Sequence, residues 1–220
     1  MRTILLTVAM LLISALAWSQ QNDVDLRLCE IRNRDQLFRL NLINCQQRSD
    51  IDSLLYYAEE MVKVDAENQE YVAKLLDKQD VPNGLSSEAY SAIFLVVDHA
   101  DLNYQKRYFK PIKRAAREGL IKQSDVNTLY DRIMMHSNRR QLYGTQTKSN
   151  TRIIEGQPLP QPTAYLWPVR RAQNIDKRRH KAGMGTMQSQ AESYEKYGGY
   201  KFVWDRSLSI KQFKTMIGEE

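Results

Sequence analysis

Apolar residues recur at intervals of three and four through residues 35–146, where glycine and proline are scarce. This spacing is typical of amphipathic α-helices, whose apolar positions share one face. The pattern predicts one helix from about residue 51 and a separate helix over residues 65–77. A turn is expected at Asp80–Gly84, because proline sets one backbone angle there and glycine permits the other.

The most apolar segment, Ala89–Val97, is apolar nearly all round a helix. A helix of that kind is covered on every side, so we expect it at the centre of the core. The next helix is expected over about residues 102–118. Pro111 lies inside it and predicts a kink or a break, because proline removes one helical hydrogen bond.

The pattern changes after Gln146. Four of the six prolines lie in Pro158–Pro168, and residues 151–154 and 165–167 are candidate short strands. Short helices are expected beyond them, the last over residues 188–196.

These elements predict a mainly α fold, a helical domain with a small irregular or β-containing C-terminal segment. We predict a single domain at residues 20–185, a length that is usual for one domain. A predicted signal peptide over residues 1–19 precedes it, and a C-terminal extension over residues 186–220 follows it.

Residues 1–19 have the form of a secretory signal peptide. Arg2 precedes the fourteen-residue, mostly apolar run Ile4–Ala17, and cleavage would follow Ala17 or Ser19. A spanning helix needs roughly twenty apolar residues, so no integral membrane span is expected. We predict a periplasmic or secreted bacterial protein; an uncleaved anchor is the alternative.

Export would permit a disulfide between Cys29 and Cys45, the two cysteines of the chain. On one unbroken helix they would lie roughly 24 Å apart, too far to bond. A helix break at residues 33–35 would allow the bond, and the sequence leaves both arrangements open.

The basic charge belongs to the C-terminal third. Residues 147–220 carry 13 Lys and Arg against 7 Asp and Glu, whereas residues 20–146 carry 18 against 19. For an exported protein this favours an anionic cell-envelope component or another envelope protein as partner, and no nucleic acid. The alternative is a solvated face with structural salt bridges. The main basic residues are Arg170, Arg171, Lys177, Arg178, Arg179 and Lys181.

Five short motifs spread over residues 50–185 resemble one bacterial domain-of-unknown-function family, family 6624. Tyr-Gly-Thr-Gln after Asp-Arg is the most distinctive piece, while Met184 stands where the family usually has leucine. The resemblance implies no activity. The motifs are Asp65-Ala66-Glu67-Asn68, His99-Ala100-Asp101 with Gln105, Asp131-Arg132, Gln141-Leu142-Tyr143-Gly144-Thr145-Gln146, and Asp176-Lys177-Arg178-Arg179 with Gly183.

His99 and Asp131 are the candidate catalytic residues. His99 ends the most apolar predicted helix, and a histidine at a core boundary can act as a general base near neutral pH. Both residues also have a structural interpretation, in which His99 ties helix ends together by hydrogen bonds and Asp131 pairs with an arginine.

The candidate binding residues are polar side chains near predicted helix ends. Gly144 permits a turn that could present its neighbours to a ligand, or that could be locked by its own hydrogen bonds. The set comprises Asp101, Gln105, Arg132, Tyr143, Thr145, Gln146 and Arg179.

Known catalytic and cofactor motifs are absent from the sequence. It has no HExxH or CxxC pattern, no phosphate-binding loop and no GxSxG elbow. We therefore expect no metal and no cofactor.

Two hypotheses follow. The favoured one is an exported helical binding or interaction module whose polar residues stabilise the fold. The alternative is a hydrolase-like enzyme with a polar pocket around His99, Asp131 and Tyr143, in which Gln105 would also take part. Convergence on one open pocket would favour the enzyme, and closed hydrogen-bond networks would favour the module.

Overall fold

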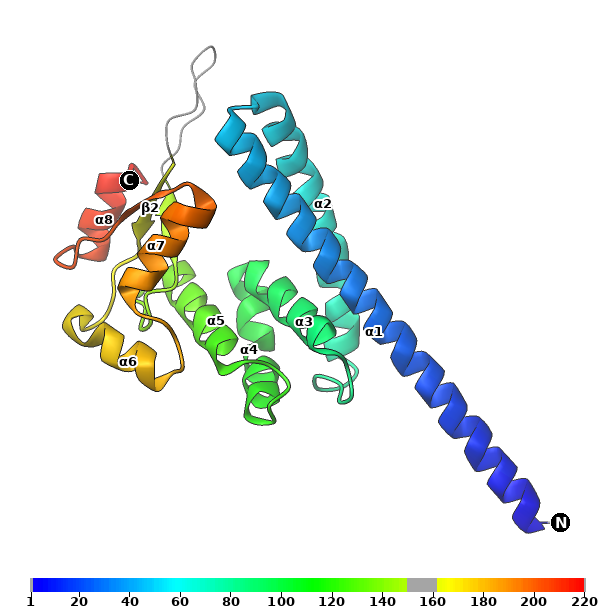
Figure 1. Ribbon diagram of the computed structural model, residues 1–220. Helices are drawn as coiled ribbons and strands as arrows, with labels where there is room; N and C mark the ends of the chain where they lie inside the picture. Colours follow the sequence, from blue (N-terminus) through cyan, green and yellow to red (C-terminus); the bar gives the residue numbers. More distant parts are fainter. Residues whose placement is uncertain (1, 150–161, 220) are drawn as a thin grey trace.

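The computed structural model describes residues 2–149 and 162–219, with side chains from residue 20 onward. The strand predicted at residues 151–154 lies outside them. The described chain is mainly helical with one small sheet, which confirms the predicted fold class (Figure 1). In chain order the elements are α1 (Arg2–Arg48), α2 (Ile51–Leu76), α3 (Ser87–His99), α4 (Leu102–Arg117), α5 (Gln123–His136), β1 (Thr147–Ser149), β2 (Thr163–Leu166), the 3-10 turn η1 (Ala172–Asn174), α6 (Ile175–Lys181), α7 (Met187–Gly198), β3 (Lys201–Val203) and α8 (Ile210–Ile217).

Helices α1 and α2 form a long antiparallel hairpin (Figure 1). Ser49 adopts a positive φ of 57° between them, and the Asp50 side chain caps α2 by accepting a hydrogen bond from the Ser53 backbone N–H. The prediction of a separate helix from residue 65 is wrong, because α2 runs on without a break. Asp65 lies in its middle and is an internal residue of one helix.

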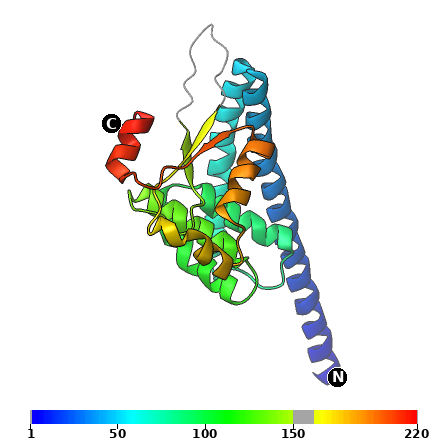
Figure 2. The same ribbon diagram turned by 60° about the vertical axis from the view of Figure 1, so that its left-hand side comes forward.

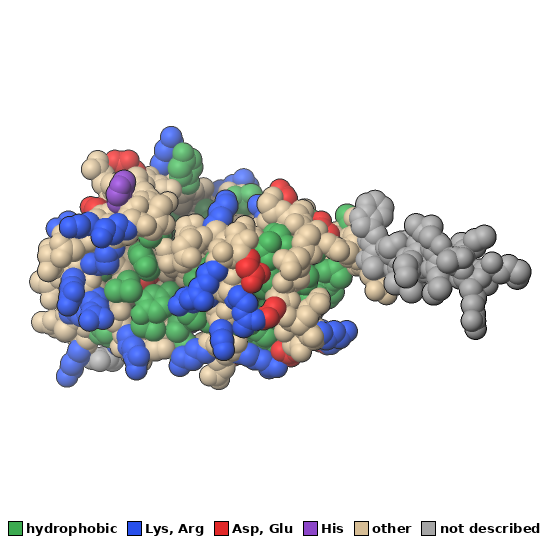
Figure 3. Space-filling model, turned by 90° about the horizontal axis from the view of Figure 1, so that it is seen from below, with side chains coloured by type: hydrophobic (Ala, Val, Ile, Leu, Met, Phe, Trp, Pro, Cys, Tyr) green, Lys and Arg blue, Asp and Glu red, His purple; other side chains and the backbone are tan. Residues whose placement is uncertain are grey.

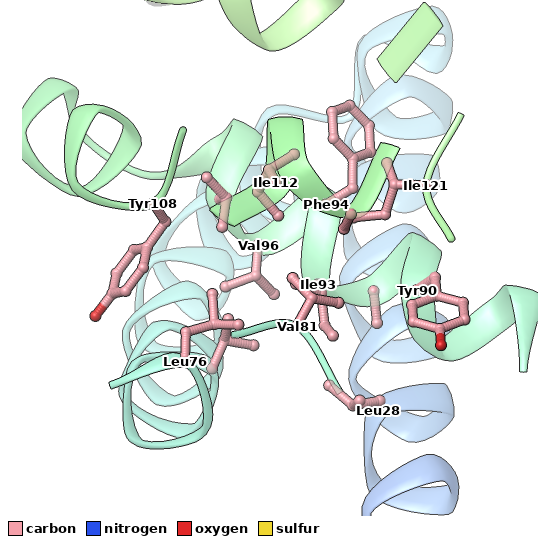
Figure 4. Close-up of a cluster of buried hydrophobic side chains, with 14 of the residues drawn as sticks. Leu28, Leu76, Val81, Tyr90, Ile93, Phe94, Val96, Tyr108, Ile112 and Ile121 are labelled. Atoms are coloured by element: carbon pink, nitrogen blue, oxygen red, sulfur yellow. The ribbon is translucent and has the colours of Figure 1, made fainter. Parts of the chain in front are cut away.

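Helix α3 is the centre of the main core, as its apolar pattern predicts. Ile93 and Val97 are fully buried, and the helix packs against α1, α2, α4 and α5 (Figure 4). Burial of each such aliphatic side chain stabilises the fold by roughly 1.5–3 kcal/mol. The neighbouring helices contribute four fully buried aliphatic side chains to this core, Leu28, Val72, Ile112 and Leu129.

Helix α4 continues through Pro111, so the predicted break does not occur. Tyr108 and Ile112, on either side of the proline, are both buried in the core. Their packing holds the two halves in one helix, although proline removes one backbone hydrogen bond.

The C-terminal region is a three-stranded sheet covered by short helices. Strand β1 pairs with β2 antiparallel, and β2 pairs with β3 in parallel, with α6 and α7 lying between those two strands in sequence. Parallel neighbours require such a crossover. Phe213 and Ile217 of α8 pack on Trp167 and Met135, so the C-terminal extension contributes to a buried cluster.

Both cysteines lie on the uninterrupted helix α1 and are free. Residues 33–35 are helical, so the break that a disulfide would require is not formed. Across the described residues, we find no helix with the length and apolar character needed to cross a membrane.

Candidate functional site

His99 belongs to a polar cluster that joins three helices. Its Nδ1 atom lies 3.1 Å from Oδ1 of Asp35 and 3.0 Å from Nε of Arg39, both on α1. Nη2 of Arg39 also donates to Asp65 of α2, at 3.0 Å. We call these four residues, Asp35, Arg39, Asp65 and His99, the three-helix polar cluster.

Burial and neighbouring charges shift the pKa of both carboxylates of this cluster. Burial alone would raise the pKa of Asp35, but the hydrogen bond and charge of His99, together with the charge of Arg39, lower it from 3.8 to about 2. Burial raises the pKa of Asp65 despite its contact with Arg39. Nδ1 of His99 can donate to Asp35 when it carries a hydrogen, and it can accept from Arg39 when it does not. The cluster connects α1, α2 and the end of α3.

Asp131 organises a different part of the molecule. It is fully buried on α5 and accepts hydrogen bonds from the backbone N–H groups of Leu142 (2.7 Å), Tyr143 (2.9 Å) and Thr145 (3.2 Å). The Thr145 hydroxyl donates to it as well, at 3.2 Å. Successive N–H groups turned toward one anion form a nest, and Gly144 permits that turn with a φ of 69°.

The surroundings of Asp131 are those of a structural carboxylate. Burial raises its pKa, and the hydrogen bonds from residues 142, 143 and 145 oppose the rise. Both oxygens are engaged by groups of this loop, so the carboxylate fixes the chain between α5 and β1.

Gln105 and Arg132 stabilise the carboxyl-terminal end of α3. The amide nitrogen of Gln105 donates to the carbonyl oxygens of Asp98 and Ala100, both at 2.8 Å. Nη2 of Arg132 lies 2.8 Å from Oδ2 of buried Asp98. Asp101 caps the amino-terminal end of α4 instead, where it accepts from the Tyr104 N–H at 2.8 Å.

Gln146 completes the network around the loop of Asp131. Its backbone N–H donates to Oε1 of Gln141 at 2.9 Å, and its side chain donates to Thr145 Oγ1 at 3.1 Å. Gln141 is fully buried and also donates to the carbonyl oxygen of Trp167 at 2.6 Å. Sequence reasoning used Gln141 as part of a motif and did not single it out as the residue that joins this loop to β2.

The predicted polar pocket is thus divided between separate networks. His99 contacts α1, Gln105 contacts the end of α3, and Asp131 contacts the loop after α5. Tyr143 meets Asp131 through its backbone N–H, and no hydrogen bond joins its ring hydroxyl to His99 or Asp131 in the described chain. The hydrogen bonds of these networks hold the ends of helices and one turn in place.

Two of the six clustered basic residues also have internal roles. Arg178 donates to the carbonyl oxygens of Leu142, Arg170 and Arg171 at 2.7–3.0 Å. Arg179 is buried and donates to the Tyr143 carbonyl oxygen at 2.7 Å. The exposed members of the cluster are Arg170, Arg171, Lys177 and Lys181.

A second set of exposed cations lies on α4, where the charge balance of the sequence gave no signal. Lys106, Lys110, Lys113 and Arg117 follow one another at intervals of four, three and four residues, so they share one helix face. None of these four, which we call the α4 basic face, forms an ion pair with a described residue. Acidic residues elsewhere in residues 20–146 offset these four cations in the net charge. The helical spacing of the four residues is the sequence signal that could have identified this face.

The neighbouring arginines of α4 differ from that face. Arg107 pairs with Asp77 at 2.7 Å, and Arg114 pairs with Asp80. Lys and Arg side chains also gather on the side where α4 ends and α6 lies, with few acidic groups among them (Figure 3). The described surface therefore carries exposed cations both on α4 and around α6.

Fold and networks together define a mainly α-helical domain whose polar residues hold helix ends and a turn in place. No set of three or more His, Cys, Asp or Glu side chains is arranged for a metal ion in the part of the chain that is described. The chain belongs to the Family of unknown function (DUF6624), whose sequence model matches residues 22–202. The match runs from α1 into β3 and thus includes α7. No curated protein matches the chain. No solved structure matches it either.

Proposed function

We propose that this protein is an exported, non-catalytic interaction module that binds an anionic component of the cell envelope. The observation that carries the proposal is the α4 basic face, an exposed row of cations with no acidic partner among the described residues. Export is supported by the apolar run at residues 4–17. The exposed cations near α6 extend the same positive field.

The geometry of the α4 basic face suits a broad anionic surface. Its ends are eleven residues apart, which is about 16 Å along a helix. Three of its four members are lysines, and lysine acts as a compact point charge without the bidentate fork of arginine. Such a row attracts densely spaced negative charge and has little preference for one chemical group.

The polar networks favour this module over the hydrolase alternative. A general base needs a lone pair directed at substrate. Here both oxygens of Asp131 accept hydrogen bonds from its own loop, and Nδ1 of His99 lies against Asp35 and Arg39. These contacts support a structural role for Asp131, and they hold the His99 ring against α1 through its Nδ1 atom.

The test compares two double variants of α4 that remove the same charge. Lys110→Gln with Lys113→Gln removes unpaired cations, whereas Arg107→Gln with Arg114→Gln removes cations that are already paired with Asp77 and Asp80. Each lysine near an anionic surface contributes about 1 kcal/mol, so we expect the lysine variant to lose roughly 30-fold in affinity. The arginine variant should lose much less.

Binding is measured by co-sedimentation at low and high salt with three kinds of particle. These are phosphatidylglycerol vesicles, phosphatidylcholine vesicles and beads coated with polyglutamate. Preference for the lipid or the polymer identifies the source of the negative charge. Binding should weaken as salt rises, because salt screens exposed charges. Equal losses in the two double variants, or salt-independent binding, would contradict the proposal.

A further inference from the structure

A cavity of about 480 Å³, widely open to solvent, lies where the C-terminal region meets helix α1. Helix α7 runs beside the α1–α2 hairpin (Figure 2), and the hydroxyl of Tyr200 lies 3.0 Å from Oε1 of Gln46 on α1. The volume is in the range that holds a small organic molecule. Its lining includes Ile43, Arg179, Gln190, Ser193, Tyr194 and Tyr200.

Arg179 gives this cavity a buried positive charge. Only 4% of the residue is exposed, yet no acidic side chain of the described chain forms an ion pair with it. Its Nη1 donates to the Tyr143 carbonyl oxygen and to Oε1 of Gln190, both at 2.7 Å, and its Nε donates to the Gly185 carbonyl oxygen. All three acceptors are neutral, and the negative charges of Asp176 and Asp131 act on the guanidinium only from a distance, without a described ion pair.

One nitrogen of the guanidinium group has N–H donors that are not used by the described part of the protein. Nη2 of Arg179 donates to no group that the structure describes. A buried charge is costly unless it is paired, and burial lowers the pKa of Arg179 from its ordinary value. Nη2 is not among the buried atoms that lack a partner, so it is open to solvent, and an anion in the cavity can replace water there, since guanidinium groups bind carboxylate and phosphate oxygens strongly.

The rest of the wall combines the polar side chains of Ser189, Gln190 and Ser193 with apolar surface. Ser193 is exposed on α7, and its hydroxyl has no hydrogen-bond partner among the described residues. Tyr194 and Tyr200 stand edge to face, with ring centroids 6.3 Å apart, and Ile43 faces them from α1. An apolar body can therefore pack beside the charge.

We propose that this cavity binds a small organic anion, with its carboxylate or phosphate group at Nη2 of Arg179 and its apolar body against Ile43 and the tyrosine rings. The site is separate from the α4 basic face, and the two proposals fail independently. The α4 double variants should leave binding in this cavity unchanged.

The experiment measures binding of benzoate, phenyl phosphate and neutral benzamide to the full chain by ligand-observed NMR. Both anions should bind, and benzamide should bind at least about 10-fold more weakly, which is the effect of one charge-assisted hydrogen bond. The anion that binds more tightly identifies the acidic group that the site prefers.

Two variants locate the binding. Ser193→Trp fills the cavity from an exposed position and leaves every hydrogen bond of Arg179 in place. Arg179→Met removes the charge, and its matched control is Arg178→Met, which removes a neighbouring arginine that also donates to backbone carbonyls but does not line the cavity.

We expect at least a 10-fold loss, the approximate contribution of one charge-assisted hydrogen bond, in Ser193→Trp and in Arg179→Met, and at most about a 2-fold change in Arg178→Met. If Arg179→Met does not fold, Ser193→Trp alone decides the matter. Three results would overturn the proposal. They are benzamide binding as tightly as benzoate, full binding in Ser193→Trp, and no binding of either anion at about 50 mM, which would nearly saturate a site with a Kd of about 1 mM.

Discussion

At the scale of single residues, buried carboxylates hold separate parts of this chain together. Asp131 fixes the turn after α5, while Asp35 joins α1 to the end of α3. Each is buried because its oxygens meet hydrogen-bond donors, which offsets the cost of removing the charge from water. Such groups make the stability of the domain depend on pH.

Asp35→Asn tests that dependence. The native pKa of Asp35 is about 2 against an ordinary 3.8, so its charge stabilises the fold fully above pH 4 and the contribution is lost as pH falls toward 2. We expect the variant to be less stable by about 2 kcal/mol at pH 7, and the difference to shrink below pH 4. Urea unfolding at pH 7, 4 and 3 measures it. A difference that stays constant over this range would show that the charge of Asp35 is not responsible.

The partners of the candidate site residues could not be predicted from the sequence. His99 is prominent because it follows an apolar helix, but Asp35 and Arg39, which contact it, lie 64 and 60 residues earlier. No spacing rule connects residues so distant. Asp131 differs, since its donors follow it within 14 residues, and a turn locked by its own hydrogen bonds was one of the two interpretations that the sequence allowed.

At the scale of elements, α4 combines a buried face with a basic face in one helix. Tyr108, Ile112 and Ala115 are buried, and the cations lie on exposed positions between them. The apolar positions therefore determine which side of the helix presents its charge to solvent. Pro111 is the unfavourable residue of this element.

Pro111→Ala should stabilise the protein. The substitution restores the backbone N–H that can donate to the carbonyl oxygen of Arg107, and it removes the steric conflict of the ring with that carbonyl. Proline costs about 3 kcal/mol inside a helix, and since the helix has adapted to it we expect a gain of roughly 1–3 kcal/mol. The measurement is thermal and urea unfolding, with exposed Lys110→Ala as the control. A loss of stability would mean that packing of the proline ring outweighs the missing bond.

At the scale of the whole molecule, the C-terminal segment is joined to the helical part by a small core of its own. Phe213 of α8 is 1% exposed and lies edge to face on Trp167, with ring centroids 5.1 Å apart. Trp167 also donates from its ring nitrogen to the Arg139 carbonyl oxygen at 2.8 Å. Helix α8 is thus connected through this tryptophan to the segment that follows α5.

Phe213→Ala measures how much that connection contributes. Removal of a fully buried phenylalanine leaves a cavity and costs about 3–5 kcal/mol. Met216→Ala is the matched control on the same helix, because Met216 is 43% exposed and its loss should change the free energy of unfolding by less than about 0.5 kcal/mol. Urea unfolding followed by tryptophan fluorescence gives both values. Equal small effects would show that α8 contributes little to the folded state.

The sequence alone determined the mainly α class, the central position of Ala89–Val97 and the turn before it, because hydrophobic periodicity and turn chemistry act between near neighbours. Tertiary structure decided how α2 continues past Asp65, how α4 continues past Pro111, and that Cys29 and Cys45 stay apart on one helix. It also decided which polar residues meet. Those outcomes depend on packing between segments distant in the chain, and packing energy overrides local preference when a buried face is continuous.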